Sequence, residues 1–151
     1  MPFVLKYNYT TNTFSKVSLP DSNCEGIRSF VRDGTKVYGV ARQKLYVYTQ
    51  GGAWESFCSI RLGNDFRGMR IADSYLFIAS GWNSNGAGEH GGLEVVDLIH
   101  KTTRYYTSSD IYIPSDTIFA IEIEQRSQDN YRLWLGTMNG VANCQLIKLR
   151  N

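Results

Sequence analysis

The sequence predicts an all-β protein of short antiparallel strands, and three observations lead to this prediction. Aromatic residues make up 13% of the 151 positions, and the apolar segments are rich in Val, Ile, Thr and aromatic side chains, which favour strands. No segment keeps the apolar spacing of a helix over about twelve residues. Turn-forming pairs such as Asp33-Gly34 and Asn139-Gly140 recur about every eight to twelve positions. This pattern is typical of a sandwich, a barrel or a propeller.

An internal repeat decides between these architectures. Residues 4–17 align without a gap on residues 44–57, and residues 93–106 show the same order of strand, polar turn, aromatic residue and strand. A second unit, in which a strand leads through an aspartate to a more apolar strand, occurs at residues 26–41, 68–80 and 117–137. Units of about 40–50 residues with four strands are the blades of a β-propeller. The sequence therefore predicts propeller blades of four antiparallel strands.

We expect one propeller-type domain over residues 1–151, because the length suits a single core. Residues 3–19 supply two outer strands without inner partners, at 3–9 and 13–19. Blade 1 spans residues 25–62, with strands at 27–32, 36–41, 44–49 and 54–60. Blade 2 spans residues 65–110, with strands at 68–72, 75–80, 92–97 and 103–107. The incomplete blade 3 spans residues 113–151 and lacks a fourth strand, its three strands lying at 117–124, 131–137 and 141–149.

The second strand of each blade is apolar on both faces, as Leu133, Trp134 and Leu135 illustrate. Such a strand is expected to be covered by neighbouring blades on both sides.

Two segments also resemble known repeats. Residues 130–141 look like the repeat of two-component-regulator-type sensor propellers. Residues 91–97 look like the Gly-Leu-x-Val-hydrophobic-Asp segment of other bacterial and archaeal propeller repeats. The resemblance implies a propeller fold and no particular function, because such motifs are structural and occur in propellers of many functions.

Three blades are fewer than the roughly four to eight with which propellers close. An open array leaves blade faces and strand edges uncovered, and such features mark association surfaces. We therefore expect a homodimer in which two copies close a six-bladed ring by strand exchange. The N-terminal strand pair of one copy would complete the last blade of the other, burying Phe14 and Val17. Alternatively, the sequence is part of a longer chain.

Two groups of residues are candidates for ligand binding. The long loop of blade 2 carries Trp82, which can stack on a sugar or a peptide, together with the hydrogen-bonding residues Asn83, Asn85 and His90. The alternative is a flexible hairpin loop without a ligand. Arg28 and Arg70 stand near the start of two innermost strands, where they would line the central channel and bind an anion. The alternative for these arginines is a structural role, in which they hydrogen-bond loop carbonyls of the next blade.

The sequence offers little for catalysis or metal binding. The three cysteines are widely spaced, and neither His90 nor His100 has the spacing of a metal ligand. No nucleophile motif is present. Glu122 and Glu124 share one face of a strand, which we interpret as the less buried face of a terminal blade rather than an acid/base pair. We expect no enzyme activity, no cofactor and no metal.

The charge and hydropathy patterns restrict the partners. The net charge is +2 without a basic block, and no apolar run is long enough to span a membrane. We therefore expect neither nucleic acid nor membrane as a partner. Without a recognisable signal peptide, we expect a cytoplasmic or virion-associated location rather than secretion, in a viral or prokaryotic source.

These observations favour a non-enzymatic binding or assembly module that recognises a protein or a peptide on its loop face. Its other expected partner is a second copy of itself. A carbohydrate-binding, lectin-like propeller with Trp82 as its stacking platform is the alternative. A sensor-domain fragment of a larger propeller protein is a third interpretation.

Overall fold

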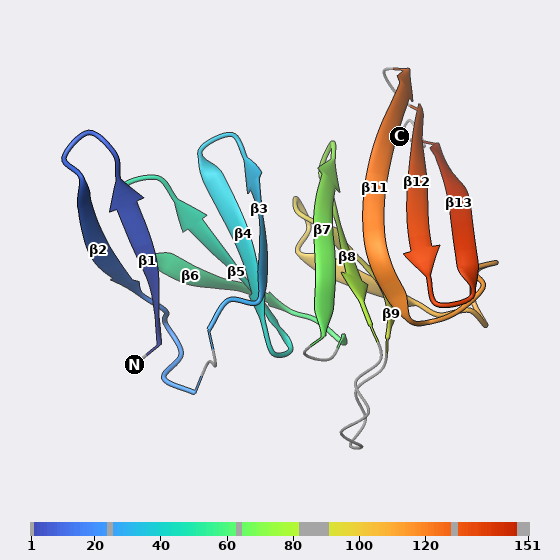
Figure 1. The fold of residues 1–151 in the computed structure, drawn as a ribbon, viewed down its shortest axis with the longest axis horizontal. Coiled ribbons are helices and arrows are strands. Elements are labelled where there is room, and N and C mark those ends of the chain that lie inside the picture. The colour runs from blue at the N-terminus through green and yellow to red at the C-terminus, as the bar shows by residue number, and fades with distance from the viewer. Residues whose placement is uncertain (1, 24–25, 63–64, 82–90, 128–129, 148–151) are drawn as a thin grey trace.

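The computed structural model describes residues 2–23, 26–62, 65–81, 91–127 and 130–147, in which thirteen strands form four antiparallel sheets (Figure 1). The N-terminal hairpin consists of β1 (Phe3–Asn8) and β2 (Thr13–Ser18). The first sheet contains β3 (Ser29–Asp33), β4 (Lys36–Ala41), β5 (Lys44–Thr49) and β6 (Trp54–Ser59). The second sheet contains β7 (Phe66–Ala72), β8 (Tyr75–Ser80), β9 (Gly92–Asp97) and β10 (Thr102–Tyr106). The third sheet contains β11 (Ile118–Ser127), β12 (Asn130–Thr137) and β13 (Gly140–Ile147).

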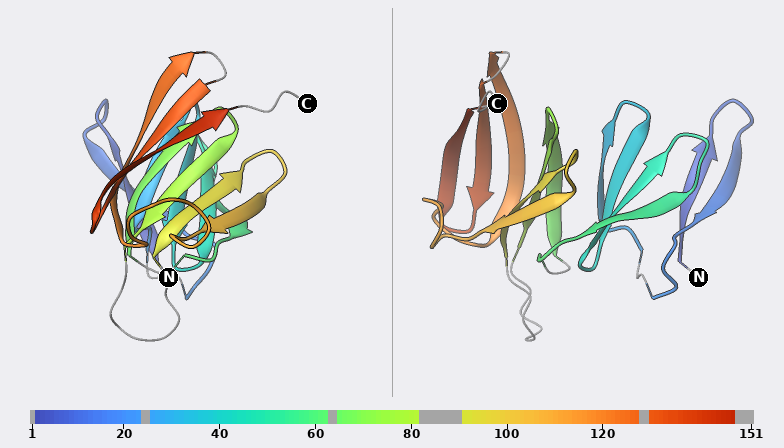
Figure 2. Two further views of the ribbon diagram at one scale, coloured as in Figure 1. Left: turned by 90° about the vertical axis from the view of Figure 1, so that its right-hand side faces the viewer. Right: turned by 180° about the vertical axis from the view of Figure 1, so that it is seen from behind.

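Each sheet is a meander, in which strands that follow one another in the sequence pair with each other, and this confirms the predicted antiparallel arrangement. The sheets follow one another along the longest axis of the molecule and do not close into a ring (Figures 1 and 2). Several element bounds differ from the prediction by a single residue, and three differ by more. The strand expected at 68–72 begins at Phe66. The strand expected at 27–32 begins only at Ser29, and the strand expected at 117–124 continues to Ser127.

The inner strands carry a repeated irregularity that aligns the second and third sheets. In β7 the register shifts at Arg67, between Phe66 opposite Ser80 and Gly68 opposite Ala79. In β11 the register shifts in the same way at Phe119, between residues 118 and 120. A β-bulge of this kind increases the local twist and fixes the pairing of the rest of the strand. The two sheets can therefore be compared residue by residue.

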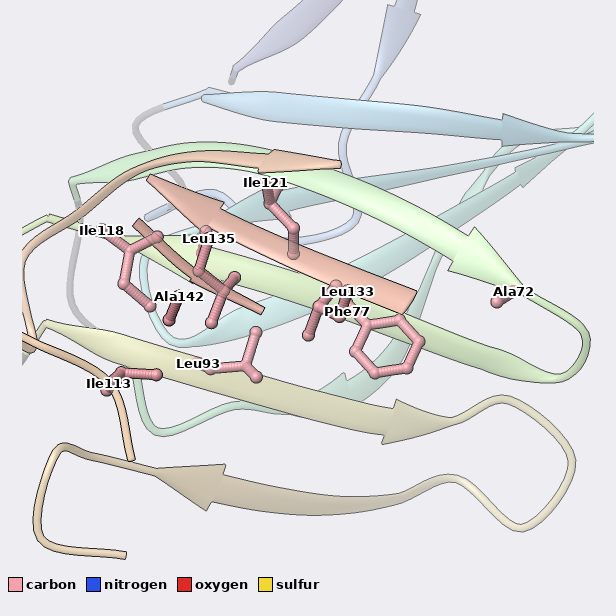
Figure 3. Packing of buried hydrophobic residues seen from close by; sticks show 10 residues of the cluster. Ala72, Phe77, Leu93, Ile113, Ile118, Ile121, Leu133, Leu135 and Ala142 are labelled. Carbon is pink, nitrogen blue, oxygen red and sulfur yellow. The ribbon is translucent and has the colours of Figure 1, made fainter. Parts of the chain in front are cut away.

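Apolar clusters fill the spaces between successive sheets. Between the first and second sheets, Tyr38 from β4 belongs to one cluster with Met69 from β7 and with Leu76 and Ile78 from β8. Between the second and third sheets, Phe77 from β8 belongs to a cluster with Ile121, Leu133 and Leu135 (Figure 3). The second sheet thus contributes one face to the core before it and one face to the core after it.

The N-terminal hairpin covers part of the first sheet. Alternate residues of a strand point to opposite faces, and here Val4, Val17 and the following Leu19 pack with Tyr46 and Trp54 of the first sheet. The opposite face of the hairpin is exposed and apolar, with exposed side chains at Phe3, Leu5, Tyr7 and Phe14.

A buried carboxylate connects the first sheet to the second. Glu94 of β9 is completely buried, and the N–H of Arg61 donates to both of its oxygens at 3.0 and 2.8 Å. The N–H of Leu62 donates to Oε2 at 3.0 Å. These two residues belong to the connection that leaves β6, so Glu94 holds the chain where it crosses between sheets. Burial raises the pKa of Glu94, although the hydrogen bonds from Leu62, Arg61 and Thr103 lower it.

Replacing Glu94 tests this connection. Glu94→Ala removes the acceptor of the buried Leu62 N–H and of the part-buried Arg61 N–H, and we expect the free energy of unfolding to fall by about 2–4 kcal/mol. Glu94→Gln keeps an acceptor and is expected to cost less. Urea unfolding monitored by tryptophan fluorescence measures both changes, and equal losses in the two variants would contradict the assigned role.

The direction of the pKa shift of Glu94 gives a second prediction. Because the folded-state pKa lies above the usual value, the folded protein retains this proton more readily than the unfolded chain. The free energy of unfolding contributed by Glu94 therefore falls as the pH rises through the folded-state pKa. We expect wild type to gain stability relative to Glu94→Gln when the pH is lowered from 7 towards the ordinary pKa of a glutamate. A constant difference between the two proteins across that range would contradict this sign.

Candidate functional site

The loop residues predicted to bind a ligand, Trp82, Asn83, Asn85 and His90, lie outside the described residues. Their role stays a prediction. Among the described residues, the candidate binding surfaces lie at the two ends of the array of sheets. Within these residues, the outer face of the first sheet is covered only in part, by the N-terminal hairpin. The outer face of the third sheet has no further sheet beside it in the described part of the chain.

The two predicted channel arginines occupy different positions. Arg70 lies within β7 and opposite Phe77, whereas Arg28 precedes β3 and donates its backbone N–H to the carbonyl of Val40 at 2.8 Å. Counted from the following hairpin turn, the counterpart of Arg28 is the bulged residue Arg67 rather than Arg70. The similar sequences around Arg28 and Arg70 suggested equivalent positions. The two residues are not equivalent, because the segment from Arg28 to its hairpin turn is longer than the segment from Arg70 to its turn.

Arg70 forms an ion pair with the next sheet. Its Nη2 donates to Oε2 of Glu122 at 2.8 Å, and its Nε lies 3.1 Å from the same oxygen. The partner is thus a carboxylate of β11 rather than a loop carbonyl. The Arg70 guanidinium lowers the pKa of Glu122. Both side chains are largely exposed, so this pair contributes little to stability, about 0–1 kcal/mol.

Phe14 and Val17 lie on opposite faces of the N-terminal hairpin. Val17 is half-buried against the first sheet of its own chain. Phe14 is exposed and lies 4.9 Å, ring centre to ring centre, from Tyr7. The part of both residues in an assembly stays a prediction, and of the two it is Phe14 that presents its side chain on the outer face of the hairpin.

The outward face of the third sheet carries an aromatic residue within a charged group. The Nε1–H of Trp134 donates to Oε2 of Glu124 at 3.1 Å, and the Arg132 guanidinium lies 5.6 Å from the indole centre. Arg126 lies 3.0 Å from the same Glu124 oxygen. Pairing places Glu122 and Asn143 on either side of Trp134. The face can therefore stack on a flat group while its rim exchanges hydrogen bonds.

The open face of the first sheet lies at the other end of the array. Phe30 of β3 is 71% exposed, and Arg32 is exposed two residues further along the same face. The Nε of Arg32 donates to the carbonyl of Gly34 at 2.8 Å. Neither Phe30 nor Trp134 was predicted to lie at a surface, although their positions in the first and last repeats are a signal for it.

A separate cleft of about 460 Å³ lies beside the turn between β4 and β5. Lys44 Nζ and the hydroxyl of Tyr46 both donate to Oδ2 of Asp21 at 2.8 Å. These hydrogen bonds lower the pKa of Asp21. These three side chains bind one another and attach Asp21 to β5, which is a structural arrangement.

The two described thiols lack the properties of nucleophiles. Burial, followed by the charge of Glu94, raises the pKa of Cys58 to about 11, and burial also raises the pKa of Cys144. A metal-binding group of three His, Cys, Asp or Glu residues does not occur in the described part of the chain. Within that part there is also no helix with the length and apolarity needed to cross a membrane.

Comparison with known proteins supports the fold. No family model and no curated protein matches the chain. Two crystal structures of the extracellular domain of BT4673 from B. thetaiotaomicron are similar, one described as a putative one component system and one as a putative hybrid two component system. Their TM-scores are 0.64 and 0.67, each at 17% identity, over 87% and 92% of this chain. The chain spans only 16% and 18% of their lengths. The likeness shows a shared all-β, propeller-like fold.

The raised pKa of Cys58 predicts slow alkylation. At pH 8 the thiolate fraction should be about 100-fold lower than for a thiol at its ordinary pKa, because the pKa has moved from 9.0 to about 11. We expect iodoacetamide to modify Cys58 slowly in the folded protein and rapidly in urea, as measured by peptide mass spectrometry. Comparable rates in both conditions would show that Cys58 is not protected by the fold.

Proposed function

We propose that this chain is a non-enzymatic binding and assembly module of propeller-like sheets, and that its principal partner is a second copy of itself. One observation carries the proposal. Met69 and Ile121 are 2% and 4% exposed, whereas Phe30, at the same register of the first sheet, is 71% exposed. The later sheets bury a side chain that the first sheet leaves in water.

The energetic argument favours covering both ends. Burying one large apolar side chain contributes about 1.5–3 kcal/mol relative to exposure. The outer face of the N-terminal hairpin adds four exposed apolar side chains, namely Phe3, Leu5, Tyr7 and Phe14. A contiguous exposed patch of this kind marks an interaction surface.

The strand edges are complementary in the same sense. Among the described strands, β13 pairs with β12 alone, and the hairpin forms a sheet of only two strands. If the hairpin of one copy joins the β13 edge of the other, the joint sheet has five strands. A two-fold axis repeats this junction, so that the ring closes without an accessible edge at either end.

Carbohydrate binding is the second candidate function, and Trp134 is the observation that favours it. Its indole lies on a sheet face between Glu122, Glu124, Arg132 and Asn143, which is the combination of stacking surface and hydrogen-bonding rim that sugars require. A glycan array probed with wild type and with Trp134→Ala tests this function. Binding lost in the variant would support it, and an empty array would count against it.

Light scattering tests the proposed self-association. At tens of micromolar we expect a mass of about 34 kDa, twice the 17.1 kDa of one chain. Phe14→Asp should shift the protein towards 17 kDa, because it places a charge in the joint sheet. Ile99→Asp, at an exposed turn of the second sheet, is the matched control and should leave the dimer intact. A folded wild-type monomer under these conditions would contradict the proposal.

A further inference from the structure

We infer that the junction between two copies is built by the outward face of the third sheet of one copy on the open face of the first sheet of the other, with Trp134 against Phe30 and Glu124 beside Arg32. This inference rests on the proposed self-association, and names the surfaces that carry it.

The first step is the equivalence of three aromatic residues. The bulges at Arg67 and Phe119 align Ser80 of β8 with Thr137 of β12. Phe77 lies three residues before Ser80, and Trp134 lies three residues before Thr137. Trp134 therefore occupies the position of Phe77. The tight turns after β3 and β7 pair Asp33 with Lys36 and Ala72 with Tyr75, which places Tyr38 at the same position. Tyr38, Phe77 and Trp134 therefore share one face of their respective sheets, the face on the side of the sheet that would follow.

The second step is what covers this position inside the chain. Tyr38 is 3% exposed and clusters with Met69 of the following sheet, and Phe77 is 4% exposed and clusters with Ile121. Among the described residues, no further sheet follows the one that carries Trp134 (Figure 1). The residue that corresponds to Met69 and Ile121 is Phe30, because the register pairs it with Gly39 just as Met69 pairs with Ile78. Repetition of the internal junction thus brings Trp134 onto Phe30.

The third step is charge. Glu124 corresponds to Ala72, and Arg32 corresponds to Ile123. Ala72 and Ile123 belong to the same cluster between the second and third sheets. The same geometry at the end of the array places a carboxylate next to a guanidinium. Arg32 donates to Gly34 through Nε, and a guanidinium carries five N–H donors in all. At these two positions the ends are therefore complementary in charge, next to the apolar contact of Trp134 with Phe30.

The fourth step is shape. The hairpin already covers the part of the first sheet that contains Tyr46 and Trp54, but it leaves Phe30 exposed. The part of this face that stays open beside the hairpin is therefore narrower than a complete four-stranded sheet. The third sheet has three described strands. The surface that fits the open face of the first sheet is thus present on this chain itself, which favours a second copy over a sugar or an unrelated protein.

A mixing experiment with two charge-reversed variants tests the junction. In Arg32→Glu, both junctions of the dimer would oppose two carboxylates, and in Glu124→Arg both would oppose two guanidinium groups. We expect each variant alone to dimerise at least about tenfold more weakly than wild type. In an equimolar mixture, the mixed dimer has one junction with the wild-type pair and one with the two charges exchanged. Both junctions then pair a carboxylate with a guanidinium, so the mixed dimer should form with near wild-type affinity. Sedimentation equilibrium measures the dissociation constants.

Phe30→Ser provides an independent variant that leaves the monomer fold intact, because the side chain is exposed. It should also weaken the dimer at least about tenfold, while Ile99→Ser serves as its matched control. Thermal unfolding of each variant confirms that the chain is folded.

The outcomes separate this inference from the proposed function. A wild-type monomer would overturn both. A wild-type dimer that is indifferent to Phe30→Ser, or charge-reversed variants whose mixture fails to recover affinity, would overturn the assigned junction and leave self-association standing. Selective dimerisation of the mixture, together with loss in Phe30→Ser, would establish the junction. Dimerisation that withstands all these variants, together with glycan binding that depends on Trp134, would show that a sugar occupies this face instead.

Discussion

The structure depends on one constraint: a sheet with two apolar faces must be covered on both sides. The second sheet satisfies it within the chain, since its two faces supply Phe77 to one core and Met69 to the other. Within the described residues, the first sheet is covered only in part on its outer side, and the third sheet is covered on one side. The apolar face of a sheet is broad, because it extends over the length of several strands. A second sheet covers such a face, whereas a loop is too small to do so. The order of stacking and the open ends both follow from this requirement.

Polar contacts act at the edges of the stack and determine how one sheet is placed on the next. Glu94 binds backbone N–H groups in the connection between the first two sheets, outside the ladders of the strands. Arg70 of the second sheet forms an ion pair with Glu122 of the third sheet, between the edge strands β7 and β11. A buried charge without hydrogen-bond partners destabilises a protein. The buried Glu94 side chain has such partners, so it can hold the connection in place. The exposed ion pair contributes direction more than stability.

The open ends also explain why the third sheet differs from the interior one. At the position of Phe77 it has a tryptophan, and beside it Glu124 stands where the second sheet has Ala72 and Asn143 stands where it has Val95. A face with one aromatic residue and paired charges remains compatible with water when it is uncovered. It also keeps enough apolar surface to bind a matching face, which is the composition found in interfaces that form between folded partners.

The sequence by itself determined the strands, their order and their pairing. Alternation and turn residues act within a few positions, so β4, β8 and β12 were placed within a residue or two of their bounds. The tertiary structure decided which faces are covered. The sequence predicts that Trp134 belongs to a strand covered on both faces. Its side chain is partly exposed, because in the described chain no further sheet lies next to it. Val17 and Phe14 look alike in the sequence, yet alternation turns one towards the first sheet and leaves the other outside. The burial of Glu94 likewise needed the structure, because its hydrogen-bonding partners Arg61 and Leu62 lie more than thirty residues away and only packing brings them together.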